Sequence, residues 1–411
     1  MIERLRQTVD SLEKPFENFM YQLHRWTSDL DVLEDNKKRI TDMLRTNGYD
    51  TVYSDEEDNV VGIISGLKEA ESLVLISRLD FRSDSRSMPN YAYPVNYSGE
   101  ISSRYTAGIT ANIMAGSAVK RAVLPLKGDI IHCFIPQVDG YGYSLKHLLE
   151  RVSDEYGDRI KGVVLVEPTE EHIYLGNKGH FEYEIRVKGG MPQRSVPRRG
   201  LDMFGTMFPL VHELEKVSHH LPSNSSLGTS RLRIKDVHYT GNSIYDDDKE
   251  FQIIVDRKFV PEENEEEILS KARTIANTIY HTEHNDDFEV STALATKKIR
   301  TRGGMEYMAK KEVKPWIMPA HHPFVLDALG ALRDARVAVD TGYWKELSTV
   351  GGCTCTEFNI PTIGFGPGTE ADVLKNGSVA MKAVTDASWK LACVIRRLIG
   401  MPTFGWSEDE I

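Results

Sequence analysis

The sequence has 411 residues. Because one domain usually contains roughly 100–200 residues, we expect two domains. The chain carries 50 Lys and Arg residues against 61 Asp and Glu residues, which gives a formal charge of −11. This acidic balance argues against a nucleic-acid partner, since such proteins usually present a basic surface. A composition of 40% hydrophobic and 27% charged residues is typical of a globular protein and excludes disorder as the main state.

The cysteines and the apolar segments indicate a cellular location. Four cysteines in a chain of this length do not make a disulfide framework, and we expect reduced thiols. They are Cys133, Cys353, Cys355 and Cys393. The first residues lead into a charged amphipathic helix that lacks the apolar core of a signal peptide. No run of about 18 apolar residues is present, so we expect no membrane span and a cytoplasmic protein.

Hydrophobic periodicity predicts alternating helices and strands in the first part of the chain. The expected helices cover 1–48 as two helices closed by Asn47-Gly48, then 107–123 and 145–152. The expected strands cover 59–64, 73–77, 129–135 and 162–166. Several of these strands are continuous apolar runs, which suit a sheet that is buried on both faces. The alternation predicts an α/β fold with a mostly parallel mixed sheet flanked by helices.

The pattern changes near residue 178. It indicates a strand at 181–187, a helix at 203–221, strands at 230–239 and 251–260, and a helix from 261 to about 280. The α/β pattern then resumes with a helix at 323–334, a strand at 361–365 and a helix at 379–399. We therefore expect residues 1–177 and 291–411 to form one α/β domain. Residues 178–290 would form an inserted α+β domain.

Four motifs occur in a recognisable order along the chain. They are Asp58-Asn59-Val60-Val61-Gly62, Glu167-Pro168-Thr169 followed by Gly176-Asn177-Lys178-Gly179, Val255-Asp256-Arg257-Lys258-Phe259-Val260-Pro261, and Ile363-Gly364-Phe365-Gly366-Pro367-Gly368. This ordered set resembles the M20 peptidase family, which includes acetylornithine deacetylase, succinyl-diaminopimelate desuccinylase and glutamate carboxypeptidase. The resemblance covers almost the whole chain. It implies that the inserted unit is a lid and dimerisation domain.

The resemblance also implies a site with two zinc ions, but this sequence departs from the family's ligands. Arg78 stands at the His of a His-x-Asp motif whose Asp is Asp80, and Arg104 stands at the bridging Asp. A Glu-Glu pair is replaced by Val-Asp, which leaves Asp139 as the candidate catalytic residue. Asp80 and Glu167 remain at ligand positions. A guanidinium cannot bind zinc, because it stays protonated and has no lone pair to offer.

Two further family histidines are missing. The late His of the family falls near Leu374, and no His follows His322. The lid His that reaches a partner's active site in the family is Gln193 here. We therefore expect no cofactor, with zinc required only if the chain is an active hydrolase.

Three interpretations of the arginine substitutions remain open. Arg78 and Arg104 can pair with Asp80 and Glu167 in a salt-bridge network, which would avoid the cost of burying like charges without a metal. The same arginines can instead bind a small anion. A relocated metal site is the third interpretation.

Other residues have more than one interpretation each. Arg257 matches a family position where an Arg often meets a substrate carboxylate, or it forms a salt bridge at a strand end. Cys353 lies where the family has a substrate-binding loop. It contacts a ligand there, acts as a thiol nucleophile, or is only a small polar loop residue. His321 and His322 suit a loop or a helix start better than a metal site, and His172 suits the surface.

The sequence thus supports two functions. The first is a metallopeptidase-like protein that has lost the two-zinc site and acts as a non-hydrolytic binding or partner subunit. It would form a homodimer, or a heterodimer with a catalytic relative, through the lid domain, and it would bind a small anionic metabolite. The alternative is an active amidohydrolase or peptidase that acts on N-acyl amino acids or small peptides with an altered or metal-free site. Neither function involves nucleic acid or a membrane.

Overall fold

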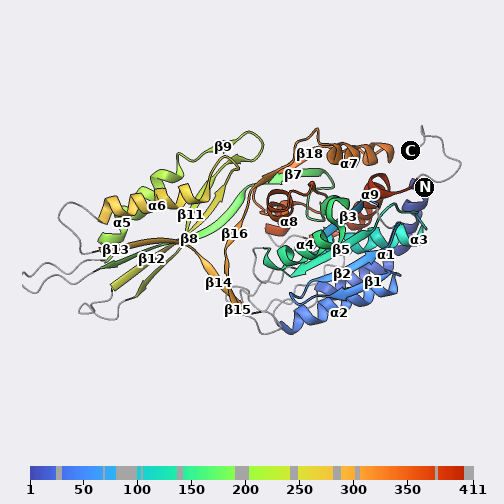
Figure 1. Cartoon of the computed structure of the whole chain (residues 1–411), viewed down its shortest axis with the longest axis horizontal. Helices are drawn as coiled ribbons and strands as arrows, with labels where there is room; N and C mark the ends of the chain where they lie inside the picture. The colour runs from blue at the N-terminus through green and yellow to red at the C-terminus, as the bar shows by residue number, and fades with distance from the viewer. Residues whose placement is uncertain are drawn as a thin grey trace, which may run out of the picture. The chain divides into compact units, whose positions relative to one another are not determined.

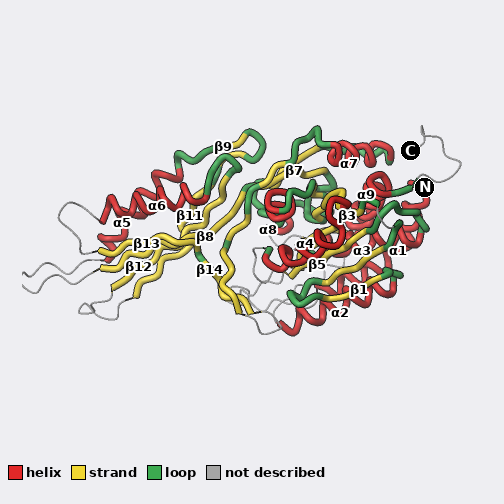
Figure 2. Tube along the Cα trace, in the orientation of Figure 1, coloured by secondary structure: helices red, strands yellow, loops and turns green. Residues whose placement is uncertain are grey.

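The computed structural model describes residues 1–24, 30–67, 70–79, 100–102, 105–136, 142–189, 203–240, 249–280, 288–300, 306–374 and 378–401. The chain divides into two compact units. Unit 1 contains Met1–Asn177, Ile299–Tyr307 and Trp316–Ile411, and unit 2 contains Lys178–Lys298 and Met308–Pro315. Figure 1 labels the elements of both units, and Figure 2 colours them by type.

Unit 1 is an α/β structure. Its helical segments are α1 (Ile2–His24), α2 (Leu30–Thr46), α3 (Thr106–Arg121), α4 (Tyr143–Tyr156), η1 (Gly157–Arg159), α7 (Pro323–Asp334), η2 (Gly352–Glu357), α8 (Glu370–Leu374) and α9 (Met381–Ile399). Its strands are β1 (Thr51–Ser54), β2 (Val60–Ile64), β3 (Ser72–Leu79), β4 (Glu100–Ser102), β5 (Ile130–Pro136), β6 (Ile160–Leu165), β7 (Ile173–Asn177), β17 (Trp316–Ile317), β18 (Thr341–Trp344), β19 (Thr362–Gly364) and β20 (Ser378–Ala380).

Nine of these strands form one mixed sheet in the order β1-β2-β5-β3-β6-β19-β7-β17, with β18 beside β7. The pairs β5–β3, β3–β6 and β6–β19 are parallel. The pairs β1–β2, β2–β5 and β7–β17 are antiparallel. The parallel strands therefore occupy the middle of the sheet, where their carboxyl ends meet at a common edge.

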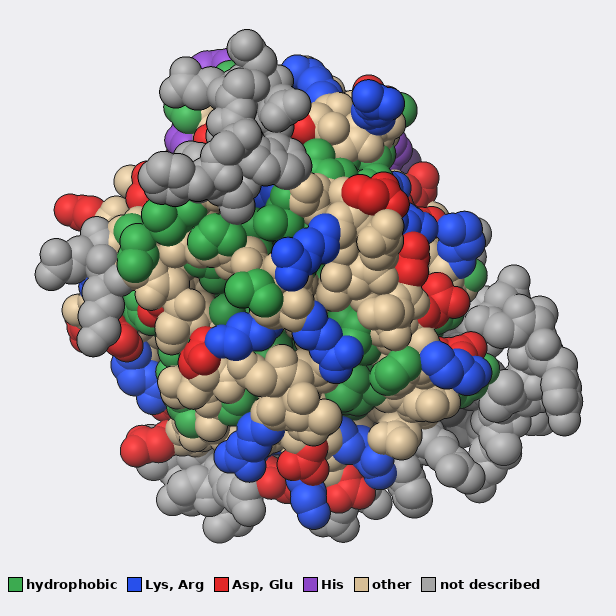
Figure 3. Space-filling view, turned by 90° about the vertical axis from the view of Figure 1, so that its right-hand side faces the viewer, with side chains coloured by type: hydrophobic (Ala, Val, Ile, Leu, Met, Phe, Trp, Pro, Cys, Tyr) green, Lys and Arg blue, Asp and Glu red, His purple; other side chains and the backbone are tan. Residues whose placement is uncertain are grey.

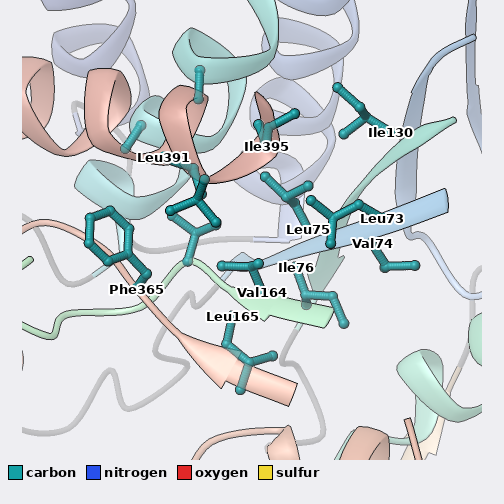
Figure 4. Packing of buried hydrophobic residues seen from close by; sticks show 14 of the residues in the cluster. Leu73, Val74, Leu75, Ile76, Ile130, Val164, Leu165, Phe365, Leu391 and Ile395 are labelled. Carbon is teal, nitrogen blue, oxygen red and sulfur yellow. The ribbon is translucent and has the colours of Figure 1, made fainter. Parts of the chain in front are cut away.

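The core of unit 1 follows from the apolar runs in these strands. Every described residue of β3 and β5 is buried, so both faces of the central sheet are covered. Helices α1, α3 and α9 pack against one another, and α3 and α9 contact β3. Figure 4 shows side chains of β3 near Leu391 and Ile395 of α9.

The face seen in Figure 3 shows Lys and Arg side chains interspersed with Asp and Glu, without a stripe of one sign on that face. Among the described helices of the chain, none is long and apolar enough to cross a bilayer.

Unit 2 is built on an antiparallel sheet. Its strands are β8 (Gly179–Gly189), β9 (Ser223–Asn224), β10 (Gly228–Thr229), β11 (Arg231–Thr240), β12 (Lys249–Phe259), β13 (Phe288–Leu294) and β16 (Glu312–Val313), and its helices are α5 (Met203–Ser218) and α6 (Glu265–Tyr280). The sheet order is β11-β12-β8-β13, with β16 also paired to β8. Strands β14 (Thr296–Arg300) and β15 (Glu306–Lys310) form a separate ribbon in the connection between the units.

The two faces of the unit 2 sheet differ. Phe181, Tyr183, Ile185 and Val187 of β8 alternate along the strand and are buried in one apolar cluster. Leu210 and Leu214 of α5 and Ala272, Ala276 and Tyr280 of α6 belong to the same cluster. The helices therefore cover one face of the sheet, as Figure 1 shows. The intervening residues of β8 lie on the other, polar face.

The structure confirms the predicted fold class, a mixed sheet flanked by helices with an inserted α+β unit. One range differs from the expectation. Residues 291–411 were expected to lie wholly in the first domain, but 291–298 and 308–315 belong to unit 2. The reason is strand pairing, because β13 and β16 both hydrogen-bond to β8. The inserted unit thus has a fourth long strand, which the sequence analysis did not identify.

Candidate functional site

The site lies where the parallel strands β3 and β6 end side by side. Arg78 is the penultimate residue of β3, and Glu167 follows β6 by two residues. These strands pair directly, with Ile76 opposite Leu165. In open α/β sheets, ligands usually bind outside the carboxyl ends of the strands. Arg78 and Glu167 therefore meet at the edge where the fold class places functional sites.

Arg78 and Glu167 form a two-pronged ion pair. The Nε atom of Arg78 lies 2.5 Å from Oε1 of Glu167, and Nη2 lies 2.8 Å from Oε2. The residues are 3% and 1% exposed. Two parallel N–H···O bonds to one carboxylate are the strongest geometry that an Arg offers. Both carboxylate oxygens of Glu167 are thus committed to Arg78.

Two more groups surround the guanidinium of Arg78. Its Nη2 donates to the hydroxyl of Tyr105 at 2.8 Å, and its carbon Cζ lies 4.3 Å from the centre of the Tyr105 ring. A stacked aromatic ring attracts a cation through its electron-rich face. A longer contact of 3.4 Å joins Nη1 to the carbonyl oxygen of Ser348. Arg78 is therefore fixed in direction by partners from three separate segments.

The backbone around Glu167 is also fixed. The hydroxyl of Thr169 accepts from the N–H of Gly366 at 3.0 Å and donates to its carbonyl at 3.3 Å. The indole N–H of Trp344 donates to the carbonyl of Pro168 at 2.8 Å. The backbone of Gly366 approaches so closely that a Cβ there would lie 2.5 Å from the carbonyl oxygen of Glu167. This contact explains why the Gly-rich motif follows β19.

A second buried network lies in the same unit. Asn177 accepts from the indole N–H of Trp316 at 2.8 Å and from the N–H and hydroxyl of Thr349 at 3.0 and 2.6 Å. Asn177 is 0% exposed. Its amide oxygen therefore ties the loop that holds Ser348 to the end of β7.

The structure describes some of the predicted site residues and leaves others outside its described ranges. Arg78 and Glu167 come together, as the salt-bridge interpretation expected for this pair. Asp80, Arg104, Asp139 and Gln193 lie outside the described residues.

Arg257 lies at the end of β12 and is 1% exposed. Its Nη2 pairs with Oε1 of Glu263, and its Nη1 donates to the carbonyls of Lys258 and Arg231. Ser230 binds the other carboxylate oxygen of Glu263. This arrangement is the strand-end salt bridge, one of the two roles that the sequence left open for Arg257.

Cys353 lies in η2, a π-helix that follows the Ser348 loop. Burial, with a smaller contribution from Glu357, raises the pKa of the Cys353 thiol to about 12. Such a thiol stays protonated at neutral pH and is a poor nucleophile. The structure favours a packing role for Cys353.

The histidines take structural positions. His322 caps α7, where its Nδ1 accepts from the N–H of Phe324 at 3.2 Å, which confirms the predicted helix start. His172 accepts at Nδ1 from the backbone N–H of Asp340.

The sequence analysis did not assign Tyr105 and Ser348 to the site. Tyr105 is the residue before α3 and follows the candidate residue Arg104. An aromatic residue beside a candidate Arg was the sequence feature that could have indicated its role. Ser348 carried no signal, because it contacts Arg78 through its backbone carbonyl, which every residue has.

One group among the described residues has the donor set of a metal site. His180, Glu182 and Asp256 each offer a ligand atom, and these atoms lie within 4.8 Å of one another. All three belong to unit 2.

Comparisons with known proteins place this fold. No protein-family model matches the sequence. The sequence is 26% identical over 285 residues to the uncharacterized protein YgeY of Escherichia coli K12. The match covers 67% of this chain and 66% of YgeY, slightly less than two thirds of that protein's length.

Solved structures extend the likeness over almost the whole chain. The dipeptidase Dug1p of Saccharomyces cerevisiae superposes with a TM-score of 0.69 at 11% identity, over 97% of this chain and 98% of Dug1p. YxeP of Bacillus subtilis, a dinuclear metal-binding peptidase of the M20 family, has a TM-score of 0.62 at 13% identity, over 94% and 98%. The chain therefore has the fold of the M20 peptidases, which confirms the resemblance indicated by its motifs.

The expectation that no cofactor is needed is wrong. It rested on the several ligands that are missing from the family's two-zinc site, whereas the structural neighbours include a dinuclear metal-binding peptidase, and unit 2 holds a possible metal-binding group. The donor sets of the two places differ. At Glu167 the neighbouring position that the resemblance gives to a ligand is Arg78, and a guanidinium offers no lone pair, so that pair lacks the donor set of a metal site. The imidazole and carboxylates of His180, Glu182 and Asp256 do fit one.

Proposed function

We propose that this chain is a non-hydrolytic binding or partner subunit with a peptidase fold, whose ligand is a small anionic metabolite. The observation that carries the proposal is the closed, buried ion pair between Arg78 and Glu167. The resemblance implies that the residues at both positions are metal ligands. In this chain one of the two, Arg78, carries a permanent positive charge instead.

Electrostatics supports this proposal. Two-metal hydrolysis needs two cations about 3.5–4 Å apart, held by anionic and neutral donors. A guanidinium at a ligand position repels such cations and cannot itself act as a ligand. The charge that metals would supply to Glu167 is already provided by the protein.

The test is a hydrolysis panel of N-acyl amino acids and dipeptides, run on the full chain with added Zn²⁺, Mn²⁺ or Co²⁺. We expect no turnover above the level of a Glu167→Gln variant. The exposed Glu155→Gln serves as the matched control. Metal-dependent turnover that Glu167→Gln abolishes and Glu155→Gln retains would overturn the proposal.

The same experiment tests the alternative, an active amidohydrolase or peptidase with an altered site. Its support is the fold, which the chain shares with a dipeptidase and a metal-binding peptidase. A Zn²⁺ titration adds a second test. Arg78→His restores the residue type that the resemblance gives this position, and it leaves Glu167 without its guanidinium partner. We expect this variant to bind Zn²⁺ at least tenfold more tightly than the wild type at this position, while Glu155→Gln should not.

We also propose that the chain forms a homodimer, or a heterodimer with a catalytic relative, through unit 2. Strand β11 is the end strand of its sheet among the described strands, and α5 lies beside it. Val237 and Tyr239 on β11 are 38% and 49% exposed, and Phe208 on α5 is 60% exposed. An unpaired strand edge next to exposed apolar side chains favours pairing with another chain.

Mass measurement in solution at micromolar concentration tests the dimer. Val237→Lys should shift the chain towards monomer, because it places a charge on the pairing edge. Leu326→Lys, a similarly exposed position on α7 in unit 1, should not. A wild-type chain that stays monomeric, and that recovers no partner from its own cells, would contradict the proposal.

A further inference from the structure

The polar face of the unit 2 sheet brings one imidazole and two carboxylates together. His180 and Glu182 are two residues apart on β8, so they share a face, opposite to the buried Phe181 and Tyr183. Asp256 on β12 is the register partner of Glu182. Side chains that face each other across two strands lie close enough to act together. The strand register thus builds this group.

The distances suit a small cation. Nε2 of His180 lies 3.0 Å from Oδ2 of Asp256, and one ligand atom of each of the three residues lies within 4.8 Å of the others. Ligand bonds of roughly 2.0–2.2 Å in a tetrahedral site separate neighbouring donors by about 3.4 Å. The donors of this group therefore lie within about one ligand spacing of the arrangement that a tetrahedral cation needs.

One carboxylate oxygen of Asp256 is available for a further contact. Its Oδ1 is shielded from solvent and has no hydrogen-bond partner among the described residues. A carboxylate oxygen that is shielded from solvent without a hydrogen bond is costly, and a cation would satisfy it.

Glu182 is held by two lysines. Lys311 donates to its Oε2 at 2.8 Å, and Lys235 donates to its Oε1. Each carboxylate oxygen has two lone pairs, so an oxygen that accepts from a lysine can also bind a metal. Metal-binding carboxylates are commonly hydrogen-bonded in this way by neighbouring groups. The lysines therefore orient Glu182 without blocking it.

We propose that His180, Glu182 and Asp256 bind a divalent cation of the zinc class on the polar face of unit 2. The donor set of one nitrogen and two carboxylates suits Zn²⁺ or Mn²⁺. Three protein ligands leave one position open for water or an anionic ligand. This site is separate from Arg78 and Glu167 and does not depend on the function proposed for them.

The test compares zinc binding by the full chain and its variants after treatment with a chelator. Zn²⁺ alone is titrated, and bound equivalents and Kd are measured by equilibrium dialysis. We expect Asp256→Asn, which keeps the shape of the side chain, to lose one equivalent or to weaken it at least tenfold. Glu184→Gln changes a carboxylate on the same strand and face outside the group, and it should leave binding unchanged.

A second readout guards against misfolding. With Co²⁺ in place of Zn²⁺, the wild type should show the visible absorption of a four-coordinate cobalt site. His180→Gln should lose that absorption and keep the circular dichroism of the wild type. Equal zinc stoichiometry and Kd in the wild type and Asp256→Asn, with no spectral difference in His180→Gln, would overturn the proposal.

Discussion

Arg78 and Glu167 leave neighbouring parallel strands and meet as a bidentate ion pair that is almost completely buried. Taking two charges out of water is costly, and only good geometry and additional hydrogen bonds offset that cost. Tyr105 and Ser348 supply the further contacts of Arg78. The pair therefore stabilises the fold only as a complete unit.

The first prediction follows from this arrangement. Arg78→Met leaves Glu167 as a buried charge without its partner, and it should lower the free energy of unfolding by about 3–5 kcal/mol. Adding Glu167→Met should recover much of the loss, because the stranded charge is removed. Urea unfolding of the single and double variants completes a double-mutant cycle.

A surface pair provides the control. Lys216 and Glu213 form an exposed pair on α5, so Lys216→Met should change the free energy of unfolding by about 0–1 kcal/mol. If Arg78→Met has an effect as small as Lys216→Met, the Arg78–Glu167 pair does not stabilise the site.

The second prediction concerns Arg257. Its ion pair with Glu263 is also buried, so Arg257→Met should destabilise unit 2 by about 3–5 kcal/mol. Because Arg257 faces Glu263 and two backbone carbonyls, this variant should bind small carboxylates as the wild type does. Calorimetry with a panel of carboxylates measures the binding. A large loss of affinity without a loss of stability would instead restore the substrate-binding role.

Local sequence signals located most of unit 1. The apolar runs predicted β2, β3, β5 and β6 within a few residues, and Pro323 marked the first residue of α7. The resemblance put Arg78 and Glu167 at ligand positions of one site, and the cost of unpaired like charges then predicted that the two could pair. These features depend on patterns within short segments, which a sequence displays directly.

Features that depend on distant pairing were missed. Strand β7 carries a Gly-Asn-Lys-Gly segment at its end, and that segment suggests a turn when it is considered alone. Strand β13 has a weak alternation, with the polar Thr292 buried between two exposed residues, and it is a strand because it pairs with β8. Ser348 reaches Arg78 through the fold of its loop alone. No local pattern encodes such contacts.

The third prediction is a pH dependence in unit 2. Burial and the neighbouring carboxylate of Glu265 raise the pKa of Glu312 to about 7, although Lys314 opposes the shift. A folded-state pKa above the unfolded value means that the folded state binds the extra proton. Stability from this group is therefore present at low pH and is lost as the pH rises from about 4.5 to 7.

Glu312→Gln isolates this contribution, because the amide stays neutral. Its free energy of unfolding should rise relative to the wild type as the pH increases from 5 to 8, as measured by urea unfolding at each pH. A constant difference between the two proteins over that range would refute the shift of Glu312.

The last prediction tests how the backbone positions Glu167. In Gly366→Ala, the new Cβ would meet the carbonyl oxygen of Glu167 at 2.5 Å, and this is a backbone atom that cannot swing away. The chain must shift there, so Glu167 should move away from Arg78, and the free energy of unfolding of the variant should fall by about 1–3 kcal/mol.

Gly330→Ala is the matched control. It lies inside α7, where a Cβ would meet only the end of the Arg397 side chain at ordinary contact distances, the nearest being 3.6 Å. Since Ala is the better helix former, Gly330→Ala should stabilise the protein by about 0.5–1 kcal/mol. Thermal and urea unfolding of both variants measure the two effects, and equal behaviour of the two alanines would show that the close approach of Gly366 does not hold the site.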